Sequence, residues 1–333
     1  MDIIAEIGQA HEGSLGVAHS YIDALANTGV TAIKWQTHIA DAESSVHEPF
    51  RINFSFEDNT RLEYWKRMEF TLEQWSGIKR HCEDKEMEFI SSPFSNVAVD
   101  LLEKIGVNRY KIGSGEVNNF LMLNKIAKTG KPIIISSGMS SFEELDNIIA
   151  FLEPYKNPLT LLQCTTAYPT NPNEWGLNVM AEMTDRYDLP VGFSDHSGDI
   201  YACLAAAVLG ASILEFHAVF DKRIFGPDSR ASLSIDQITQ LVSGVKDIEV
   251  SMNNPIDKTN NNQFQELKGI FEKSLAINTS LKKGQIIKEE MLEAKKPKFQ
   301  GIDAAKYHQV IGKVVTKDMT QWDFITIEDI ENE

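Results

Sequence analysis

Short apolar runs alternate with segments of helical spacing along most of this chain. The runs are rich in Ile, Val, Leu and Phe and are bounded by Gly, Pro or polar residues, as β-strands are. Between them, apolar residues recur every three or four positions, most clearly over Leu15–Asn27 and Thr71–Lys85. Eight strands are predicted in this way, at Ile3–Ile7, Ala32–Gln36, Phe89–Phe94, Tyr110–Ser114, Pro132–Gly138, Leu159–Thr165, Val191–Ser197 and Ile213–Val219.

This alternation predicts an α/β fold of the (β/α)8 TIM barrel type, because eight strand–helix units over about 240 residues match that barrel in count and size. A doubly wound open sheet is the alternative. Such a sheet would carry a Gly-rich phosphate loop after an early strand, and neither GxGxxG nor GxxxxGK[ST] occurs in the chain.

The connection after the second strand, His38–Phe70, is too long for an ordinary loop and holds Pro49, Arg51, several aromatic residues and many charges. Loops of this size usually carry function or structure of their own. This one leaves the carboxyl end of a strand, the catalytic side of a barrel, so we interpret it as a lid or a flap that binds a substrate. A solvated excursion is the alternative.

The pattern changes after residue 252. Residues 1–252 form the predicted barrel domain, and residues 253–275, which begin with a polar, turn-rich stretch, form a linker and a terminal barrel helix. Residues 276–333 form a small separate domain, in which 280–292 and 319–330 share a weak internal duplication. A domain this small buries little surface alone, so it is expected to lean on the barrel or on a partner subunit.

Composition excludes several classes of partner and location. The chain has 333 residues, is 42% hydrophobic and carries a formal charge of −16, which argues against nucleic acid or an anionic membrane as a partner. No apolar run approaches the ~20 residues that span a bilayer, and the N-terminus does not resemble a signal peptide. The scattered cysteines Cys82, Cys164 and Cys203 predict buried, reduced thiols in a cytoplasmic protein.

Two histidines end consecutive strand-like runs, His196 in the seventh and His217 in the eighth. The segment between them, Tyr201–Ala211, is predicted to be a helix, so the two strands are parallel and their carboxyl ends lie side by side. Paired imidazoles at that edge could hold a divalent metal with open coordination positions. The alternative is a pair of unrelated core histidines.

The other strand ends also carry polar residues. Lys34 and Lys111 would point into the barrel, which is costly unless they are paired or bind an anion. Two lysines with hydroxyl groups and glycine-flanked turns predict an anion site, and Glu6 is a candidate general base beside them. His11 is either part of the chemistry or a loop hydrogen-bonding residue. The remaining candidates are Gln36, Ser91, Ser92, Ser95, Ser114, Ser136, Ser137, Thr165, Thr166, Tyr168, Ser194 and Glu215.

Several motifs, in chain order, are similar to those of the sialic acid synthases, the family of N-acetylneuraminate, legionaminate and pseudaminate synthases. They are AEIGQAHEGSL, IKWQTH, FISSPFS, YKIGSGEVNN, IIISSGMSS, LLQCTTAYPT, GFSDHSGD and FGPDS. The tail, LKKGQIIKEEMLEAKKP to GKVVTKDM, resembles the family's antifreeze-like (SAF) domain. The resemblance covers nearly the whole chain.

The resemblance implies a condensation of phosphoenolpyruvate with an open-chain amino sugar, in which C3 of phosphoenolpyruvate attacks the aldehyde and phosphate leaves. It implies that His196 and His217 bind the metal; imidazole ligands favour Mn²⁺, with Mg²⁺ or Co²⁺ possible. Glu6 matches the proposed general base. The positions that match phosphoenolpyruvate-binding residues are Lys34, Ser92, Lys111, Ser114, Ser136 and Ser194, and those that match acceptor-sugar-binding residues are Gln36, Tyr168 and Asp228.

Three positions depart from the family pattern. Ala10 replaces an Asn, Thr166 replaces a phosphoenolpyruvate-contacting Asn, and Lys296 replaces a tail arginine that reaches the acceptor from the partner subunit of a domain-swapped homodimer. Lysine cannot reproduce a bidentate guanidinium contact, so an acceptor other than N-acetylmannosamine, such as a diacetamido-dideoxy hexose, stays open. Arg51, in the long flap, could meet the sugar instead. The same swapped homodimer is expected here.

Two other functions stay open. A related phosphoenolpyruvate synthase that uses a phosphorylated sugar should carry extra arginines for that phosphate, and the strand ends offer few. A non-catalytic sugar- or phosphate-binding barrel should have lost its lysines, histidines or Glu6, and all are present.

Overall fold

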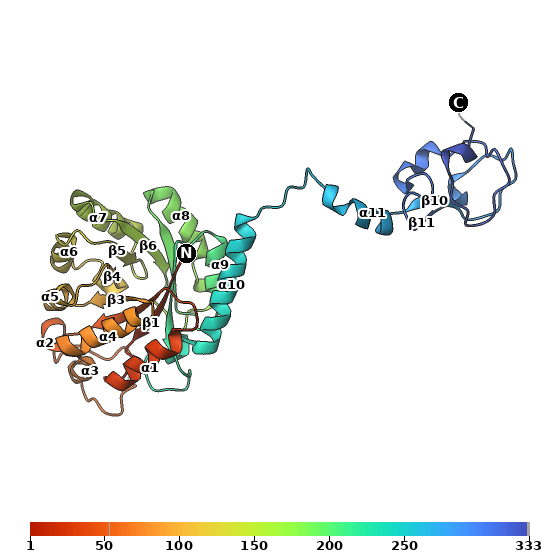
Figure 1. Ribbon diagram of the computed structural model, residues 1–333. Helices are drawn as coiled ribbons and strands as arrows, with labels where there is room; N and C mark the ends of the chain where they lie inside the picture. Colours follow the sequence, from red (N-terminus) through yellow and green to blue (C-terminus); the bar gives the residue numbers. More distant parts are fainter. Residues whose placement is uncertain (53, 332–333) are drawn as a thin grey trace. The chain divides into compact units, whose positions relative to one another are not determined.

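The computed structural model describes residues 1–52 and 54–331 and divides into two compact units, Met1–Asn254 and Pro255–Glu333 (Figure 1). Within the described residues, no helix combines the length and the apolar character needed to cross a membrane. The prediction that the three cysteines are buried free thiols is confirmed.

The first unit is a closed parallel barrel, which confirms the predicted TIM-barrel fold. Its strands follow one another in chain order and β1 pairs with β8, so no open edge remains between them. That closure excludes the doubly wound sheet. The strands are β1 Asp2–Gly8, β2 Ala32–Thr37, β3 Glu88–Pro93, β4 Tyr110–Ile112, β5 Ile133–Ser136, β6 Leu159–Cys164, β7 Val191–Asp195 and β8 Ile213–Val219, with a short β9, Leu233–Ser234, paired to β8.

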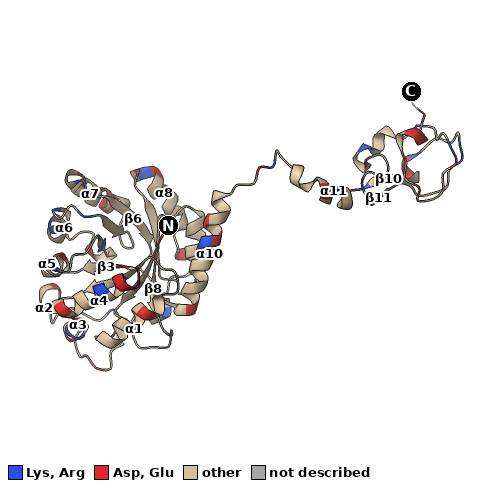
Figure 2. Ribbon diagram, in the orientation of Figure 1, with Lys and Arg blue, Asp and Glu red and all other residues tan. Residues whose placement is uncertain are grey.

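Helices surround this barrel (Figure 1). Several begin at a side-chain cap, including the capping boxes of Thr71 with Gln74 and Ser141 with Glu144, each contributing about 1 kcal/mol. Lys or Arg and Asp or Glu positions occur side by side on outer helices such as α4 and α10 (Figure 2). The helices are α1 Leu15–Leu25, α2 Ala40–Glu43, α3 Arg61–Met68, α4 Leu72–Asp84, α5 Asn96–Ile105, α6 Phe120–Ala127, α7 Phe142–Leu152, α8 Leu177–Tyr187, α9 Tyr201–Val208 and α10 Ile235–Asn253.

The barrel interior holds a small apolar cluster that is distinct from the large core between sheet and helices. Its members come from six different strands and are Ile4, Ala32, Ile90, Ile134, Leu162 and Ile213. Because side chains two residues apart in a strand share a face, the next inward layer toward the carboxyl ends is Glu6, Lys34, Ser92, Ser136, Cys164 and Glu215. The apolar layer is therefore the floor on which a polar layer rests.

The long connection 38–70 has structure of its own. It contains α2 and α3, and the buried side chains of Ala40, Tyr64, Trp65 and Met68 form a separate apolar cluster with partly buried aromatic residues around it. Arg67 ties this insert to the first βα loop through ion pairs with Asp58, inside the insert, and with Glu12. The insert is thus a packed subdomain and not a solvated excursion.

The second unit contains α11 Gln265–Phe271 and an antiparallel pair, β10 Ser274–Ile277 and β11 Leu292–Lys295. The two segments with weak internal duplication meet in it, because Leu281 pairs with Met319. The core residues of the unit are Leu275, Ile277, Leu281, Ile287, Val310, Val315, Met319 and Ile325.

Candidate active site

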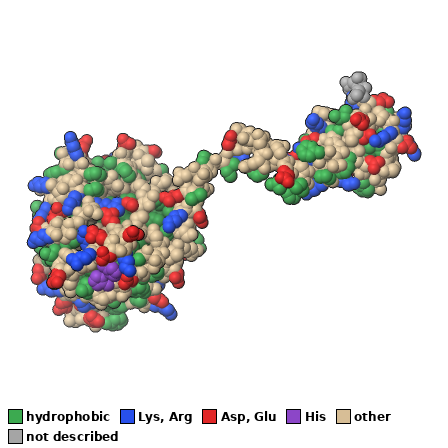
Figure 3. All heavy atoms as spheres, viewed as in Figure 1, with side chains coloured by type: hydrophobic (Ala, Val, Ile, Leu, Met, Phe, Trp, Pro, Cys, Tyr) green, Lys and Arg blue, Asp and Glu red, His purple; other side chains and the backbone are tan. Residues whose placement is uncertain are grey.

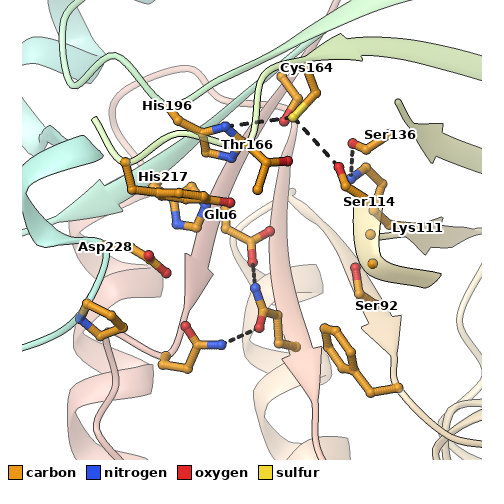
Figure 4. Close-up of a pocket in the computed structure, with 18 of the residues that line it drawn as sticks. Glu6, Ser92, Lys111, Ser114, Ser136, Cys164, Thr166, His196, His217 and Asp228 are labelled. Carbon is orange, nitrogen blue, oxygen red and sulfur yellow. Dashed lines mark hydrogen bonds between the residues drawn. The ribbon is translucent and has the colours of Figure 1, made fainter. Parts of the chain in front are cut away.

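A pocket of about 480 Å³ opens at the carboxyl ends of the barrel strands. Every candidate assigned to catalysis, metal, phosphoenolpyruvate or acceptor sugar in the first unit lines it: Glu6, Lys34, Gln36, Arg51, Ser92, Lys111, Ser114, Ser136, Thr166, Tyr168, Ser194, His196, His217 and Asp228. Lys296 belongs to the second unit, where its Nζ lies 5.2 Å from the centroid of the Phe271 ring. Figure 4 shows the pocket side chains converging from several strands.

Two buried lysines lie on one side of the pocket with two buried carboxylates. Lys111 Nζ donates to Ser136 Oγ at 2.7 Å and lies 3.2 Å from Glu215 Oε1. Lys34 Nζ lies 3.6 Å from the same Glu215 oxygen and pairs with Glu6 Oε2. Burial alone would raise the pKa of Glu215, but the ammonium groups of Lys111 and Lys34 outweigh it and hold that pKa at about 2.

The strand register explains why Glu6 joins this cluster. Glu6 of β1 pairs with Lys34 of β2 on one side and with His217 of β8 on the other. Barrel closure therefore brings the first and last strands together and places the carboxylate between the lysine cradle and the histidines.

Hydroxyl groups and a glycine complete the cradle (Figure 4). Gly138 N donates to Ser114 Oγ at 3.1 Å. A Cβ at Gly138 would lie 2.4 Å from Thr166 Oγ1 and 2.6 Å from Ser114 Oγ, so only glycine fits there. Ser92 Oγ is buried and has no hydrogen-bond partner among the described residues, which leaves that hydroxyl available to a ligand.

The two imidazoles lie side by side at the pocket wall. The ring centroids of His196 and His217 are 5.3 Å apart, and the Tyr168 ring lies 4.3 Å from that of His196. His196 Nδ1 lies 3.1 Å from the carbonyl oxygen of Thr165. Because a carbonyl only accepts, Nδ1 carries the proton and Nε2 keeps its lone pair, an arrangement typical of metal-ligating histidines.

Burial lowers the pKa of both His196 and His217 to about 3, so both rings are neutral and able to ligate near neutral pH. This donor set fits a divalent cation. Within the described residues, no group of three or more His, Cys, Asp or Glu side chains could hold a metal. An ion at this pair would therefore take its other ligands from water or substrate, which is the open coordination that catalysis uses.

The opposite side of the pocket is closed by the insert. Arg51 donates to Asp228 Oδ1 at 2.7 Å, and its guanidinium carbon lies 4.3 Å from the Tyr168 ring centroid. Burial raises the pKa of Asp228, although Arg51 opposes that shift. The rings of Phe54 and Phe225, 5.5 Å apart, make a second contact between the insert and the loop after β8.

Some pocket residues were not among the assigned candidates. Glu215 was noted at the end of β8 without a role, although its place two residues before His217 puts both side chains on one face. Cys164 lies on the same face of β6 as Leu162, and the same alternation could have found it. The residues contributed by the insert, Glu48, Arg61 and Trp65, could not be found in this way because no strand pattern places them.

His11 lies outside the pocket, which favours the loop reading. Its ring is buried, accepts from Gly13 N at 3.0 Å through Nδ1, and lies 4.8 Å from the Phe70 ring. Burial is the main cause that lowers the pKa of His11 to about 3.

We expect His11 to make the protein less stable as the pH falls below about 6.5. The unfolded chain protonates this ring near its ordinary pKa and the folded chain does not, so the unfolded state binds more protons between the two values. The free energy of unfolding should then drop by up to about 1.4 kcal/mol per pH unit from this residue. In His11→Asn, urea unfolding between about pH 6 and pH 4 should show a shallower pH dependence than in the wild type. An equal slope would contradict this.

The fold and the sequence resemble those of known synthases. A crystal structure titled as an N-acetylneuraminic acid (sialic acid) synthetase from Leptospira borgpetersenii serovar Hardjo-bovis in complex with citrate superposes with a TM-score of 0.69 at 28% identity, covering 80% of this chain and 89% of that one. That likeness covers the barrel fold and extends to sequence.

Two curated relatives match almost end to end. The N,N'-diacetyllegionaminic acid synthase of Campylobacter jejuni is 34% identical over 97% of this chain and 98% of its own. The N-acetylneuraminate-9-phosphate synthase of Homo sapiens is 31% identical over 99% of this chain and 92% of its own. The sequence pattern of the NeuB family matches residues 21–257, most of the barrel unit. With relatives of this identity over nearly its whole length, this chain belongs to the NeuB family.

Proposed function

We propose that this protein is a phosphoenolpyruvate-dependent synthase of a nonulosonic, sialic-type acid, a transferase that forms a carbon–carbon bond. Its acceptor is an open-chain N-acetylated amino sugar, either N-acetylmannosamine or a diacetamido-dideoxy hexose. The observation that carries the proposal is one pocket in which two buried lysines and two neutral imidazoles face a common space. Membership of the NeuB family supports it, because its relatives bear the names of such synthases.

The reaction joins C3 of phosphoenolpyruvate to the aldehyde carbon of the sugar, and the aldehyde oxygen gains a proton. Water adds at C2, and the C2–O bond to phosphate breaks to release inorganic phosphate. Lys34, Lys111 and Thr166 with the pocket serines Ser92, Ser114, Ser136 and Ser194 bind the phosphate and carboxylate. Glu6, hydrogen-bonded to Gln36 and close to the lysines, takes the proton of the attacking water as general base.

His196 and His217 would hold the divalent cation. Members of this family are metal-dependent in general. Imidazole ligands favour Mn²⁺, with Mg²⁺ or Co²⁺ as alternatives. When bound, the ion supplies Lewis-acid polarisation of the aldehyde oxygen. The protein's part is to keep both rings neutral and to fix His196 through the Thr165 carbonyl.

Gln36, Tyr168 and Asp228 bind the acceptor sugar, together with Arg51 from the insert. In Arg51→Ala, the acceptor KM should rise about 10- to 100-fold, because a charged hydrogen-bonding group that also orients Asp228 is lost. The phosphoenolpyruvate KM should stay within about twofold, since Arg51 does not touch the lysine cradle. Arg223→Ala is the matched control, an arginine on the loop after β8 that pairs with Asp221 at the surface. An unchanged acceptor KM in Arg51→Ala would remove Arg51 from the site.

A synthase that uses a phosphorylated sugar is the second candidate, and the name of the human relative keeps it in view. The insert brings two arginines to the pocket, which the strand ends did not offer. In the described structure both are already paired, Arg51 with Asp228 at 2.7 Å and Arg61 with Glu48 at 3.5 Å. Paired arginines leave little net positive charge for a phosphate, which favours an unphosphorylated acceptor.

A substrate panel tests the function and separates these candidates. N-acetylmannosamine, its 6-phosphate and the diacetamido-dideoxy hexoses are each incubated with phosphoenolpyruvate and Mn²⁺, and released phosphate and product mass are recorded. We expect phosphate release with an unphosphorylated sugar and a product heavier by the pyruvate unit and water. Turnover with the 6-phosphate alone would favour the second candidate, and no turnover with any sugar would favour a non-catalytic binding barrel.

We further propose that the small C-terminal domain, 276–333, is an antifreeze-like domain of a domain-swapped homodimer that brings Lys296 to the partner's pocket. A cytoplasmic location agrees with three buried free thiols. The structural division at Asn254 places α11, within the predicted linker 253–275, in the second unit. Light scattering at micromolar concentration should show a dimer, and a monomer there would contradict the swap.

A further inference from the structure

A buried histidine–glutamate pair lies directly behind the pocket wall. His38 follows β2, and Glu43 ends the short helix α2 at the start of the insert. His38 Nδ1 lies 2.6 Å from Glu43 Oε1, and both side chains are almost fully buried. Neither lines the pocket, so neither is placed to touch a substrate.

The pair continues into the site through one amide. His38 Nε2 lies 3.2 Å from Gln36 Oε1, and Gln36 Nε2 donates to Glu6 Oε1 at 2.8 Å. Gln9 also donates to Gln36 Oε1. A chain of hydrogen bonds thus runs from the insert to the carboxylate of Glu6.

The directions of these bonds follow from chemistry. The ionised carboxylate of Glu6 only accepts, so the amino end of Gln36 must face it and the amide oxygen must face His38. His38 Nε2 must then carry a proton. A proton also lies between His38 Nδ1 and Glu43, since two lone pairs 2.6 Å apart would repel each other. If Nε2 lost its proton, Gln36 would have to turn its oxygen toward Glu6.

Two aromatic rings hold the imidazole in this orientation. Trp65 stacks on one side at 3.9 Å between ring centroids and 21° between planes, and Phe94 stacks at 4.5 Å and 14°. Ile39 N also donates to Glu43 Oε2 at 3.2 Å. The ring is therefore fixed by packing and its proton by the carboxylate.

We propose that His38 and Glu43 are positioning residues that set the amide orientation of Gln36 and, through it, the carboxylate of Glu6. This inference rests on the proposed function, in which Gln36 binds the acceptor and Glu6 is the base. It also gives the insert a purpose beyond covering the pocket, because Glu43 and Trp65 both belong to it.

Kinetics of His38 variants test the inference. His38→Phe keeps a flat ring between Trp65 and Phe94 but has no ring nitrogen, so the acceptor KM should rise and kcat should fall, each about tenfold. The phosphoenolpyruvate KM should stay within about twofold, because Lys111 and Ser136 are untouched. Glu43→Gln should give the same split in weaker form, and His38→Gln, whose amide can still donate, should recover part of the loss.

His19→Phe is the matched control. Figure 3 shows histidine side chains gathered on the outer surface over α1 and α4, where His19 Nδ1 lies 2.8 Å from His81 Nδ1. That variant loses the same ring nitrogens away from the pocket, and its kinetic constants should match the wild type. If His38→Phe lowers only the melting temperature, or changes both KM values equally, the pair has a merely structural role and the inference is overturned.

A second measurement does not depend on turnover. The side-chain NH2 signals of Gln36, identified by their loss in Gln36→Glu, should shift in His38→Phe and Glu43→Gln and stay in place in His19→Phe. Signals that do not move would overturn the inference even in an active enzyme. If the wild type fails in the sugar panel but the signals move, the proposed function fails while the positioning role of the pair stands.

Discussion

His217→Ala is expected to lower kcat at least about 10³-fold and to abolish tight binding of Mn²⁺. Only two imidazoles meet at the pocket wall, so the loss of one leaves a single protein ligand of that type. The remaining ring, His196, cannot hold the ion alone against water. His217 also pairs in register with Glu6, which places the loss at the centre of the pocket.

Metal content after dialysis and the rate with added Mn²⁺ measure this effect. His308→Ala, at an exposed position of the second unit, is the control and should keep both. Melting temperatures of the two variants separate loss of the ion from loss of the fold. Wild-type Mn²⁺ content and rate in His217→Ala would show that the ion, if any, binds elsewhere.

Lys111→Met is expected to lower kcat/KM for phosphoenolpyruvate about 10²- to 10³-fold. Its ammonium group is buried, donates to Ser136 and pairs with Glu215, so it is already oriented toward the cradle before a ligand arrives. Methionine keeps the length of the side chain and removes only the charge and the donors. Glu215 keeps Lys34 as a partner at 3.6 Å, which limits the cost to folding.

Initial rates at varied phosphoenolpyruvate, with the acceptor saturating, measure the loss. Lys125→Met is the matched control, because Lys125 pairs with Asp100 on the outside of the barrel. The acceptor KM should change little, since the sugar side of the pocket is built by Arg51 and Asp228. A drop below tenfold would mean that Lys34 alone supplies the charge that binds the phosphate.

The part of the site built on strands could be predicted because a strand has a period of two. Lys34 with Gln36, and Glu215 with His217, share a face by spacing alone, and both pairs line the pocket. The ends of eight parallel strands meet at one rim, so residues far apart in the chain could be assigned to one place.

What could not be predicted depends on contacts between distant segments. The ion pairs among Lys34, Lys111 and Glu215 follow from how the barrel closes, and no local spacing encodes the distances between strands. The insert folds by packing Tyr64 and Trp65 against its own apolar residues, so periodicity does not show which of its side chains reach the pocket. The partners of Arg51 and His38 belong to this class.

The balance of charge within the lysine cradle bears on how the protein discriminates among small ions. Each ammonium group there already has a carboxylate neighbour, so an incoming anion must compete with Glu6 and Glu215 before it gains a contact. A monovalent ion such as chloride offers too little attraction to win that competition, whereas a ligand that presents several charges at once can. Turnover should therefore tolerate ordinary salt, and the overall charge of −16 adds a further barrier to adventitious anions.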